Sequence, residues 1–355
     1  MGGPPAVLAT LRGEIDDALD AALERLLPRL TARHEALTPV AGELGAFLRG
    51  GKRIRPALLL LGYEAAGGRD RTAVLGPALA LELLHTCALA HDDVIDRADT
   101  RRGRPTVHRT FARLHARENL AGNADEYGEA VAILLGDLAF VQADELFLDA
   151  AVAPEDLLAG FRRFTLLREE VMAGQYLDLH AAASRVVDRE TALAVATLKS
   201  GRYSVARPME VGAVLAGAPP ALVEGLGRFG DPVGRAFQIR DDLLGVFGHQ
   251  ATTGKSVAGD LVEGKRTLLV AEAAARLEPG PRAELEAGLG DPDLDTVRAA
   301  RLRELLEQSG GRAAAEAYVT AAVDEARGVL AGLELPEASA AALEELASYL
   351  GDRSA

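Results

Sequence analysis

Hydrophobic residues recur three and four positions apart along almost the whole chain, the spacing of one face of an α-helix. Segment 11–30 shows this spacing, and segment 78–89 is apolar on nearly every side. Because a helix that is apolar all round is normally buried, we predict a central core helix at 78–89. Further helices are predicted at 128–148, 155–179, 191–215, 222–247, 267–277, 282–289, 299–308, 313–333 and 336–350.

Two connections differ from the others because they are charged and rich in glycine. They cover residues 97–108 and 248–264, and each follows a predicted helix that ends in paired aspartates. The sequence has no Pro/Gly/Ser-rich linker between two halves and no repeat of fixed period. We therefore predict a single all-α domain over residues 1–355.

The composition of the chain argues against several classes of protein. The 355 residues carry a formal net charge of −14, which disfavours general binding to nucleic acid or anionic lipid. Hydrophobic residues make up 48% of the chain, enough for a large core. The single cysteine, Cys87, excludes an internal disulfide framework and fits a reducing compartment. We expect a cytoplasmic protein.

Membrane segments are not expected from the apolar runs. The N-terminal stretch has no basic segment followed by a long apolar core, so we expect no secretion signal. The runs 57–61 and 130–135 are far shorter than the roughly 20 residues that span a bilayer. The sequence therefore predicts no stable membrane insertion.

The first acidic motif, HDDVID, follows the apolar segment 78–89. On a helix, Asp92 and Asp96 lie one turn apart on one face, roughly 6 Å along the axis. Two such carboxylates repel each other unless a cation lies between them, and their oxygens suit Mg²⁺, which shares substrate phosphates. The alternative is an ordinary solvated helix end.

The second acidic motif, FQIRDDLLG, contains Asp241 and Asp242 and runs into a basic segment. Two helices that each end in paired aspartates and lead into a basic connection predict a site for a metal-bridged diphosphate. Metal ions would neutralise the phosphate charge, and Lys and Arg would bind the outer oxygens. The segment after this motif supplies Lys255, Asp260, Lys265 and Arg266.

A third candidate cluster is the basic segment GGKRIRP. Lys52 and Arg55 are three residues apart and share a helix face, whereas Arg53 points elsewhere. His85 lies two turns before Asp92 on the same face. A lone histidine in such a position is more often a core residue than a ligand.

Five blocks follow one another along the chain: GGKRIRP at 50–56, ELLHTCALAHDDVIDRADTRRGRPTVH at 82–108, AILLGDLAFVQA at 132–143, LKSGRYSVARPMEVGA at 198–213 and the two stretches FQIRDDLLGVFG and TGKSVAGDLVEGKRTLL within 237–269. In these blocks the chain resembles the trans-isoprenyl (polyprenyl) diphosphate synthases, most of all the bacterial geranylgeranyl diphosphate synthases. The resemblance implies an antiparallel helical bundle around a deep central cavity, of the isoprenoid synthase type, and a homodimer.

The resemblance also implies a cofactor. Asp92, Asp96 and Asp241 would hold three Mg²⁺ ions, or Mn²⁺ in their place, with Asp93 and Asp242 beside them. Many members of the family have a third aspartate in the second motif, where this chain has Gly245. We expect activity to survive this departure, with Asp260 as a candidate substitute.

The implied partners are isopentenyl diphosphate and an allylic diphosphate, condensed head to tail. Gln238 would lie near the reacting carbons, and Ser200 stands where the family often has Thr. The residues that would bind the allylic diphosphate are Arg101, Lys199, Lys255 and Lys265. Those that would bind isopentenyl diphosphate are Lys52, Arg55, His85 and Arg102.

Product length in this family is governed by bulk before the first acidic motif. Cys87 and Ala88 are small and leave room for a growing chain, whereas Leu84 lies deeper and could form a floor. We therefore expect geranylgeranyl diphosphate (C20), with farnesyl (C15) or longer products (C25 and above) as alternatives.

Three other functions compete with this interpretation. A terpene cyclase would not need the basic cluster at 50–56. A nucleotide-binding protein would need the complete phosphate-loop pattern, of which only TGKS at 253–256 is present. A catalytically silent subunit would lack one of the two acidic motifs, and both are present.

Overall fold

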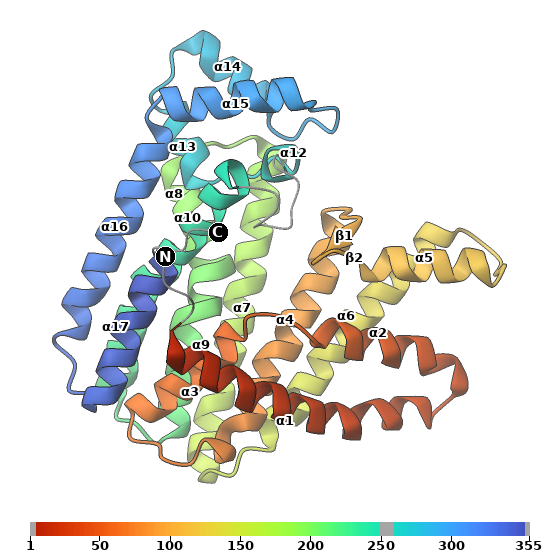
Figure 1. The fold of residues 1–355 in the computed structure, drawn as a ribbon, viewed down its shortest axis with the longest axis vertical. Coiled ribbons are helices and arrows are strands. Elements are labelled where there is room, and N and C mark those ends of the chain that lie inside the picture. The colour runs from red at the N-terminus through yellow and green to blue at the C-terminus, as the bar shows by residue number, and fades with distance from the viewer. Residues whose placement is uncertain (1–4, 249–258, 352–355) are drawn as a thin grey trace. The chain divides into compact units, whose positions relative to one another are not determined.

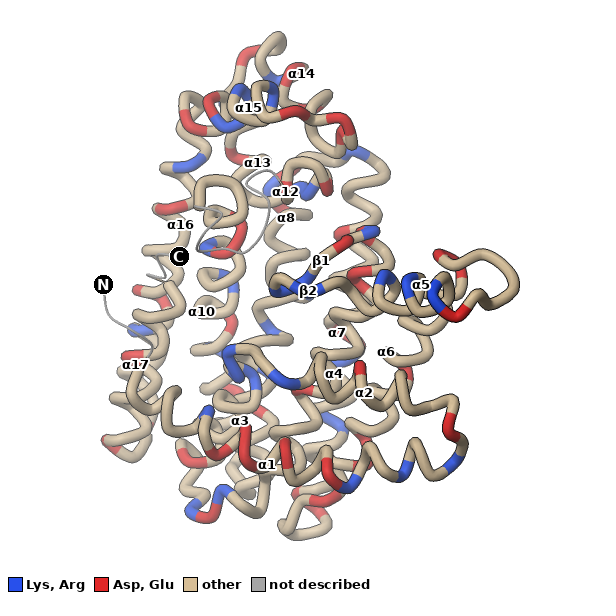
Figure 2. The backbone as a smooth tube through the Cα atoms, turned by 45° about the vertical axis from the view of Figure 1, so that its right-hand side comes forward, with Lys and Arg blue, Asp and Glu red and all other residues tan. Residues whose placement is uncertain are grey.

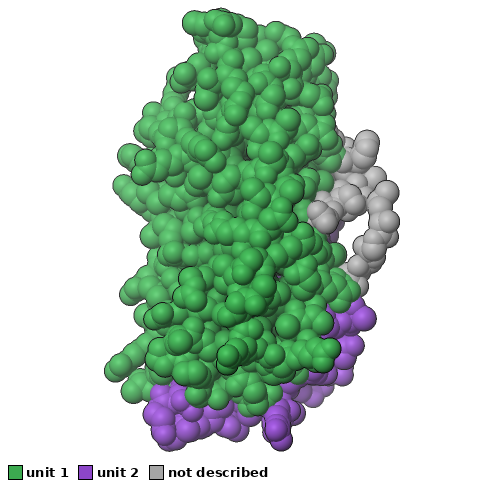
Figure 3. Space-filling model, turned by 90° about the vertical axis from the view of Figure 1, so that its left-hand side faces the viewer, with its two compact units in different colours: residues 1–5, 61–68, 158–355 green, residues 6–60, 69–157 purple. Residues whose placement is uncertain are grey.

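The computed structural model describes residues 5–248 and 259–351, and most of them are helical (Figure 1). The described chain divides into two compact units (Figure 3). Unit 2 comprises residues 6–60 and 69–157, and unit 1 comprises segment 61–68 with the described residues from 158 onward. The predicted all-α fold is confirmed, whereas the single domain and the central cavity stay predictions.

Unit 2 is organised around α4 (Leu75–Ile95), whose buried residues run from Pro77 to Asp93. This helix packs along α6 (Ala124–Leu148) and also contacts α1 (Ala6–Thr31) and α2 (Thr38–Leu48). The predicted core helix at 78–89 is therefore confirmed. The other elements that begin in unit 2 are η1 (Glu35–Leu37), α3 (Ile54–Ala65), η2 (Arg71–Val74), β1 (Thr100–Arg101), β2 (Arg104–Pro105), α5 (Val107–Arg117) and α7 (Pro154–Ser184).

The helix α4, together with the turn before it, is as long and as apolar as a helix that spans a membrane. By length and composition alone, segment Arg71–Ile95 could cross a bilayer, and it is the one such helix among the described residues. However, 67% of its most apolar window is buried inside the protein, and a buried core helix passes the same test. The absence of stable membrane insertion stays a prediction.

Unit 1 is organised around α10 (Pro220–Phe247), which contacts η3 (Ala196–Ala206), α9 (Arg207–Leu215), α16 (Gly311–Leu330) and α17 (Glu337–Gly351). Its apolar face contributes to a buried hydrophobic cluster that includes residues of the C-terminal helices. The remaining helices of unit 1 are α8 (Arg189–Val195), α12 (Gly259–Val262), α13 (Leu268–Ala274), α14 (Pro279–Gly288) and α15 (Thr296–Gln308).

Side chains cap several helix starts. Asn123 accepts hydrogen bonds from the backbone N–H groups of Asp125 and Glu126 at the start of α6. Asp188, Thr267 and Asp295 accept in the same way before α8, α13 and α15. Such caps satisfy N–H groups that the first helical turn leaves unpaired. The core of each predicted helix is confirmed, and its ends shift by a few residues.

Some elements were not predicted from the sequence. The helices α2, α3 and α5 are absent from the prediction, and the small β1–β2 hairpin lies inside the predicted connection 97–108. Its turn residues Arg102 and Gly103 both have positive φ, as a tight two-residue hairpin requires. The predicted helix 191–215 is helical, but residues 196–206 are wound as a π-helix.

Candidate functional site

The candidate residues form two groups, one in each unit. Acidic and basic residues occur together at the β1–β2 hairpin that follows α4, and again around α12, which follows α10 in the described chain (Figure 2). The predicted juxtaposition of the two acidic motifs stays a prediction, because the motifs belong to different units.

The first acidic motif occupies the last turn of α4. The backbone N–H of Asp96 donates to the carbonyl of Asp92 at 2.8 Å, so the helical winding holds these two residues one turn apart. Both are partly exposed. This is the spacing that the sequence predicts for two carboxylates that share a cation.

Asp93 differs from its neighbours because its side chain is fully buried. Its carboxylate accepts a hydrogen bond from Nε of Arg101 at 2.6 Å. Burial raises the pKa of Asp93, although the guanidinium of Arg101 acts in the opposite direction. Asp93 therefore holds Arg101, whose Nη2 lies 3.9 Å from the carboxylate of Asp92.

Three of the four predicted isopentenyl diphosphate residues, Arg55, His85 and Arg102, come together within unit 2. Arg102 donates to the backbone carbonyl of Gly50 at 3.1 Å, which places the hairpin beside the GGKRIRP segment. Burial, followed by the charges of Arg55, Arg102 and Arg101, lowers the pKa of His85 well below its usual value. His85 is therefore neutral near pH 7 and lies inside a cluster of cations.

Arg53 is a residue of this cluster whose role the sequence did not reveal. Its guanidinium donates to Glu82 at 2.6 Å, to Asp16 at 2.7 Å and to the carbonyl of Leu48 at 2.8 Å. Its backbone has a positive φ of 52°, a strained conformation for a residue other than glycine. Arg53 therefore fixes the segment between Lys52 and Arg55 to its surroundings.

The second acidic motif likewise combines an accessible and a buried carboxylate. Asp241 is partly exposed, whereas Asp242 is buried. Gln238 donates to Asp242 at 2.7 Å. Burial, together with the charge of Asp260, raises the pKa of Asp242 to about 7. Asp260 in turn accepts a hydrogen bond from Nζ of Lys265 at 2.9 Å.

The structure gives a steric reason for Gly245. A Cβ atom at this position would lie 1.9 Å from Oδ2 of Asp260, far closer than two such atoms can approach. Asp260 thus fills the space that a side chain at 245 would need. The predicted role of Asp260 as a substitute for the missing aspartate stays a prediction.

Lys199 belongs to η3, and its Nζ lies 2.6 Å from Oδ2 of Asp178 on α7. Ser200 follows in the same π-helical segment. Sequence reasoning missed Asp178. The sequence could have indicated it, because Asp178 is an acidic residue within GQYLDL, one turn after Gly174 on a predicted helix. The predicted ligand Lys255 lies outside the described residues.

The predicted metal ligands are all carboxylates, and carboxylate oxygens are ligands that Mg²⁺ prefers. Among the described residues, no three His, Cys, Asp or Glu side chains gather as a complete metal site. Mg²⁺ requires six oxygen ligands but is commonly held by one or two carboxylates together with water and substrate phosphates. Within unit 2, the spacing of Asp92 and Asp96 suits a metal of this kind, bound jointly with a diphosphate. A contribution from Asp241 stays a prediction.

The predicted chain-length residues lie on α4 before the first acidic motif. Leu84 and Cys87 are buried, and Ala88 is partly exposed. The Sγ atom of Cys87 lies 3.9 Å from Nδ1 of His91. Burial, followed by the charge of Asp137, raises the pKa of the Cys87 thiol to about 12. Cys87 therefore behaves as a small apolar side chain.

Comparisons with known proteins agree with these features. The sequence model of the family described as polyprenyl synthetase matches residues 43–306. The chain is 33% identical to a (2E,6E)-farnesyl diphosphate synthase of Mycobacterium tuberculosis, over 95% of this chain and 96% of that protein. It is 34% identical to a geranylgeranyl diphosphate synthase of Methanosarcina mazei, over 85% of this chain and 86% of the relative.

A solved structure is similar over nearly the full length. It is the geranylgeranyl pyrophosphate synthase of Corynebacterium glutamicum, complexed with isoprenyl diphosphate and magnesium. The TM-score is 0.92 and the identity 34%, covering 96% of this chain and 98% of that one. The family match, the two relatives and this fold lead to one conclusion: the chain belongs to the polyprenyl synthetase family of prenyltransferases.

Proposed function

We propose that the chain is a Mg²⁺-dependent prenyltransferase that condenses isopentenyl diphosphate head to tail with an allylic diphosphate. The main support is the cation cluster of unit 2, in which the charges of Arg55, Arg101 and Arg102 act on His85 and Arg101 also binds Asp93 of the first acidic motif. A second diphosphate needs such a cluster, because several positive groups must offset its charge. A terpene cyclase, which acts on one diphosphate, has no use for it.

The proposed roles follow from the accessibility of each group. Asp92, Asp96 and Asp241 are partly exposed and would hold the metal ions, whereas the buried Asp93 would hold Arg101 toward the allylic diphosphate. When bound, Mg²⁺ supplies positive charge that neutralises the leaving diphosphate. The neutral imidazole of His85 would contribute a hydrogen bond to isopentenyl diphosphate without adding charge to its crowded cation cluster.

The chemical step requires charge stabilisation rather than a nucleophilic side chain. Fixed cations stabilise the negative charge that develops as the allylic C–O bond breaks. The double bond of isopentenyl diphosphate attacks the resulting carbocation, and the departed diphosphate removes the proton. An apolar environment before the first motif, with Leu84 and Cys87, keeps water from the cation.

We further propose that the product is geranylgeranyl diphosphate. The small Cys87 and Ala88 allow a chain to pass, and the buried Leu84 one turn deeper on α4 limits it. Farnesyl and longer products are the alternatives, since relatives of similar identity carry the names of a farnesyl, a geranylgeranyl and a geranylfarnesyl diphosphate synthase.

Product sizing tests the function. The purified protein is incubated with MgCl₂, labelled isopentenyl diphosphate and dimethylallyl, geranyl or farnesyl diphosphate in turn, and the dephosphorylated products are sized. Labelled C20 alcohol is expected, and it should disappear when EDTA replaces magnesium. Conversion of an allylic primer to a hydrocarbon without uptake of label would favour a terpene cyclase instead.

We also propose a homodimer. Four apolar residues of α6 recur at every seventh position and are exposed: Tyr127, Leu134, Val141 and Leu148, at 36%, 66%, 59% and 57%. A heptad repeat of this kind is the pattern by which one helix packs against another. On α7, unit 1 also exposes Met172, Tyr176 and Leu179.

Light scattering coupled to size exclusion tests the dimer. Leu134→Glu should convert a dimer to a monomer. Val297→Glu, at an exposed position on α15, serves as the matched control and should leave the dimer intact. A monomeric wild-type protein at micromolar concentration would contradict the proposal.

A further inference from the structure

The chain is wound as a π-helix where it carries Lys199. This segment, η3, has eleven residues and connects α8 directly to α9. π-Helices are rare, occur mostly as single-turn bulges and are frequent at functional sites. A π-helix of this length needs support from its neighbours, and unit 1 supplies that support from α7 and α10.

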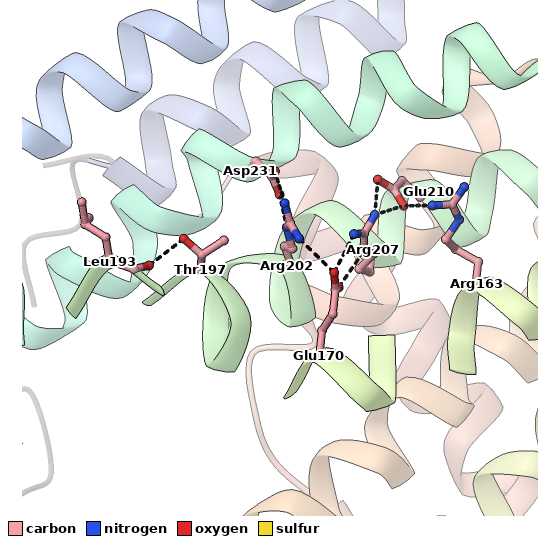
Figure 4. A network of polar contacts seen from close by, with 8 residues as sticks. All are labelled: Arg163, Glu170, Leu193, Thr197, Arg202, Arg207, Glu210 and Asp231. Carbon is pink, nitrogen blue, oxygen red and sulfur yellow. Dashed lines mark hydrogen bonds and ion pairs between the residues drawn. The ribbon is translucent and has the colours of Figure 1, made fainter. Parts of the chain in front are cut away.

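A network of three guanidinium groups and three carboxylates surrounds the C-terminal half of η3 (Figure 4). Arg202 is central, since its Nη1 donates to Glu170 at 3.0 Å and its Nε and Nη2 donate to Asp231, both at 3.2 Å. Glu170 belongs to α7 and Asp231 to α10, so Arg202 links η3 to both helices. The other members are Arg163, Arg207 and Glu210.

The π-winding explains how two arginines share one carboxylate. Arg202 and Arg207 both donate to Glu170, Arg207 at 2.7 Å through Nε and through Nη2. In an α-helix, residues five apart point about 140° away from each other. In η3 the backbone N–H of Arg207 donates to the carbonyl of Arg202, five residues earlier, which brings both side chains to the side of α7.

The same face of α7 also contacts Lys199. Glu170, Gly174 and Asp178 follow one another at intervals of four residues, so they line one side of α7. A Cβ atom on Gly174 would lie 2.2 Å from the backbone nitrogen of Lys199, which means that the two backbones touch. One turn later, Asp178 binds the ammonium group of Lys199 at 2.6 Å. Three successive turns of α7 therefore hold η3.

On its other side, η3 also contacts α10 through backbone atoms. A Cβ atom on Gly234 would lie 2.4 Å from the carbonyl oxygen of Gly201. Asp231, which binds Arg202, lies three residues before Gly234 on α10, and Gln238 lies four residues after it. Because both contacts are between backbones, a shift of η3 cannot be absorbed by side-chain rearrangement.

We propose that Arg202 is a positioning residue for prenyl transfer. By joining Glu170 to Asp231 it sets the register of η3 against α7 and α10, and thereby the place of Lys199. Arg202 need not touch substrate, since its guanidinium is occupied by the two carboxylates. The inference rests on the proposed function, in which Lys199 binds the allylic diphosphate.

Steady-state kinetics of Arg202→Met tests this role. KM for the allylic diphosphate should rise roughly ten- to hundredfold, the effect expected of a misplacement of about 1 Å, whereas KM for isopentenyl diphosphate should change less than about twofold. In a Lys199→Ala background the same substitution should have almost no further effect, because coupled residues are not additive. Losses that multiply in full, or that fall equally on both substrates, would overturn the proposal.

Two further variants keep the test decisive. Arg301→Met removes an exposed ion pair with Glu284 and should leave both KM values unchanged. If Arg202→Met fails to fold by circular dichroism, the same cycle is run with Asp231→Asn, which leaves the bond between Arg202 and Glu170 in place. Additivity of Asp231→Asn with Lys199→Ala would equally overturn the proposal.

Pyrophosphate binding separates this inference from the proposed function. Calorimetric titration with inorganic pyrophosphate and Mg²⁺ requires no turnover. Arg202→Met should weaken binding by roughly tenfold or more, and Arg301→Met should not. Equal affinity of Arg202→Met and wild type would overturn the role of Arg202 even if the wild type is active. A wild type that binds pyrophosphate but forms no product would contradict the proposed function alone.

Discussion

At the residue scale, each acidic motif combines an exposed carboxylate with a buried, supported one. Asp93 is held against Arg101, and Asp242 accepts a hydrogen bond from Gln238. A buried carboxylate is costly unless it is hydrogen-bonded or paired. The buried members therefore position other groups, whereas Asp92 and Asp241 are partly exposed and are the proposed metal ligands.

An aspartate at position 245 is expected to lower activity rather than raise it. Gly245→Asp restores the acidic pattern that many relatives have, yet it should lower kcat/KM by roughly tenfold or more. The new Cβ would lie 1.9 Å from Oδ2 of Asp260 and would displace that carboxylate. Gly328→Ala on α16 is the control and should be neutral. A Cβ atom added there would meet no atom within 4 Å apart from the nearby backbone of its own helix. Activity at or above wild type for Gly245→Asp would contradict this account.

His85 predicts a pH effect on stability. Its folded-state pKa is lowered by burial and by neighbouring arginines, so the unfolded chain gains a proton that the folded chain does not take. Stability should therefore fall as pH drops below the ordinary histidine pKa of about 6.5. His85→Gln should reduce this loss between pH 7 and pH 5.5 in urea unfolding. An identical loss in both proteins would show that His85 does not contribute.

At the scale of elements, periodicity predicts the existence of helices better than their winding. The apolar segment 78–89 identified α4, because a sequence without a polar face must be buried. The π-winding of η3 was not predictable, since it depends on Gly174, Gly234 and an ion network contributed by other helices. The hairpin after α4 was missed because its two strands are only two residues each.

The α4 helix carries a prediction about product length. Cys87→Phe should shorten the main product from C20 to C15, because the larger side chain at this buried position would fill the space proposed for the growing chain. Cys87→Ala is the control and should leave product length unchanged, since both side chains are small. Thin-layer sizing of the dephosphorylated products gives the answer. An unchanged C20 product from Cys87→Phe would remove Cys87 from the path of the chain.

At the scale of the whole molecule, an acidic protein is proposed to bind two strongly anionic substrates. The net charge of −14 gives no general attraction for a diphosphate. In the proposed function, binding depends on local groups: the cations beside α4 in unit 2, and Lys199 and Lys265 in unit 1. Spacing alone predicted the acidic pairs and the nearby basic segments, and Lys199 and the arginines of the hairpin came from the family resemblance. Neither could separate metal ligands from their supports, because burial is a property of the folded chain.

In the proposed reaction, the two acidic motifs act together on one diphosphate. This joint action is tested most directly by a double-mutant cycle on kcat with Asp92→Asn and Asp241→Asn at saturating Mg²⁺. Each single variant should lose roughly a hundredfold or more, the scale of a lost electrostatic contact to a developing charge. The double variant should be little worse than either single one, because residues that act as a unit are not additive. Losses that multiply in the double variant, or a single variant that retains full activity, would contradict the account.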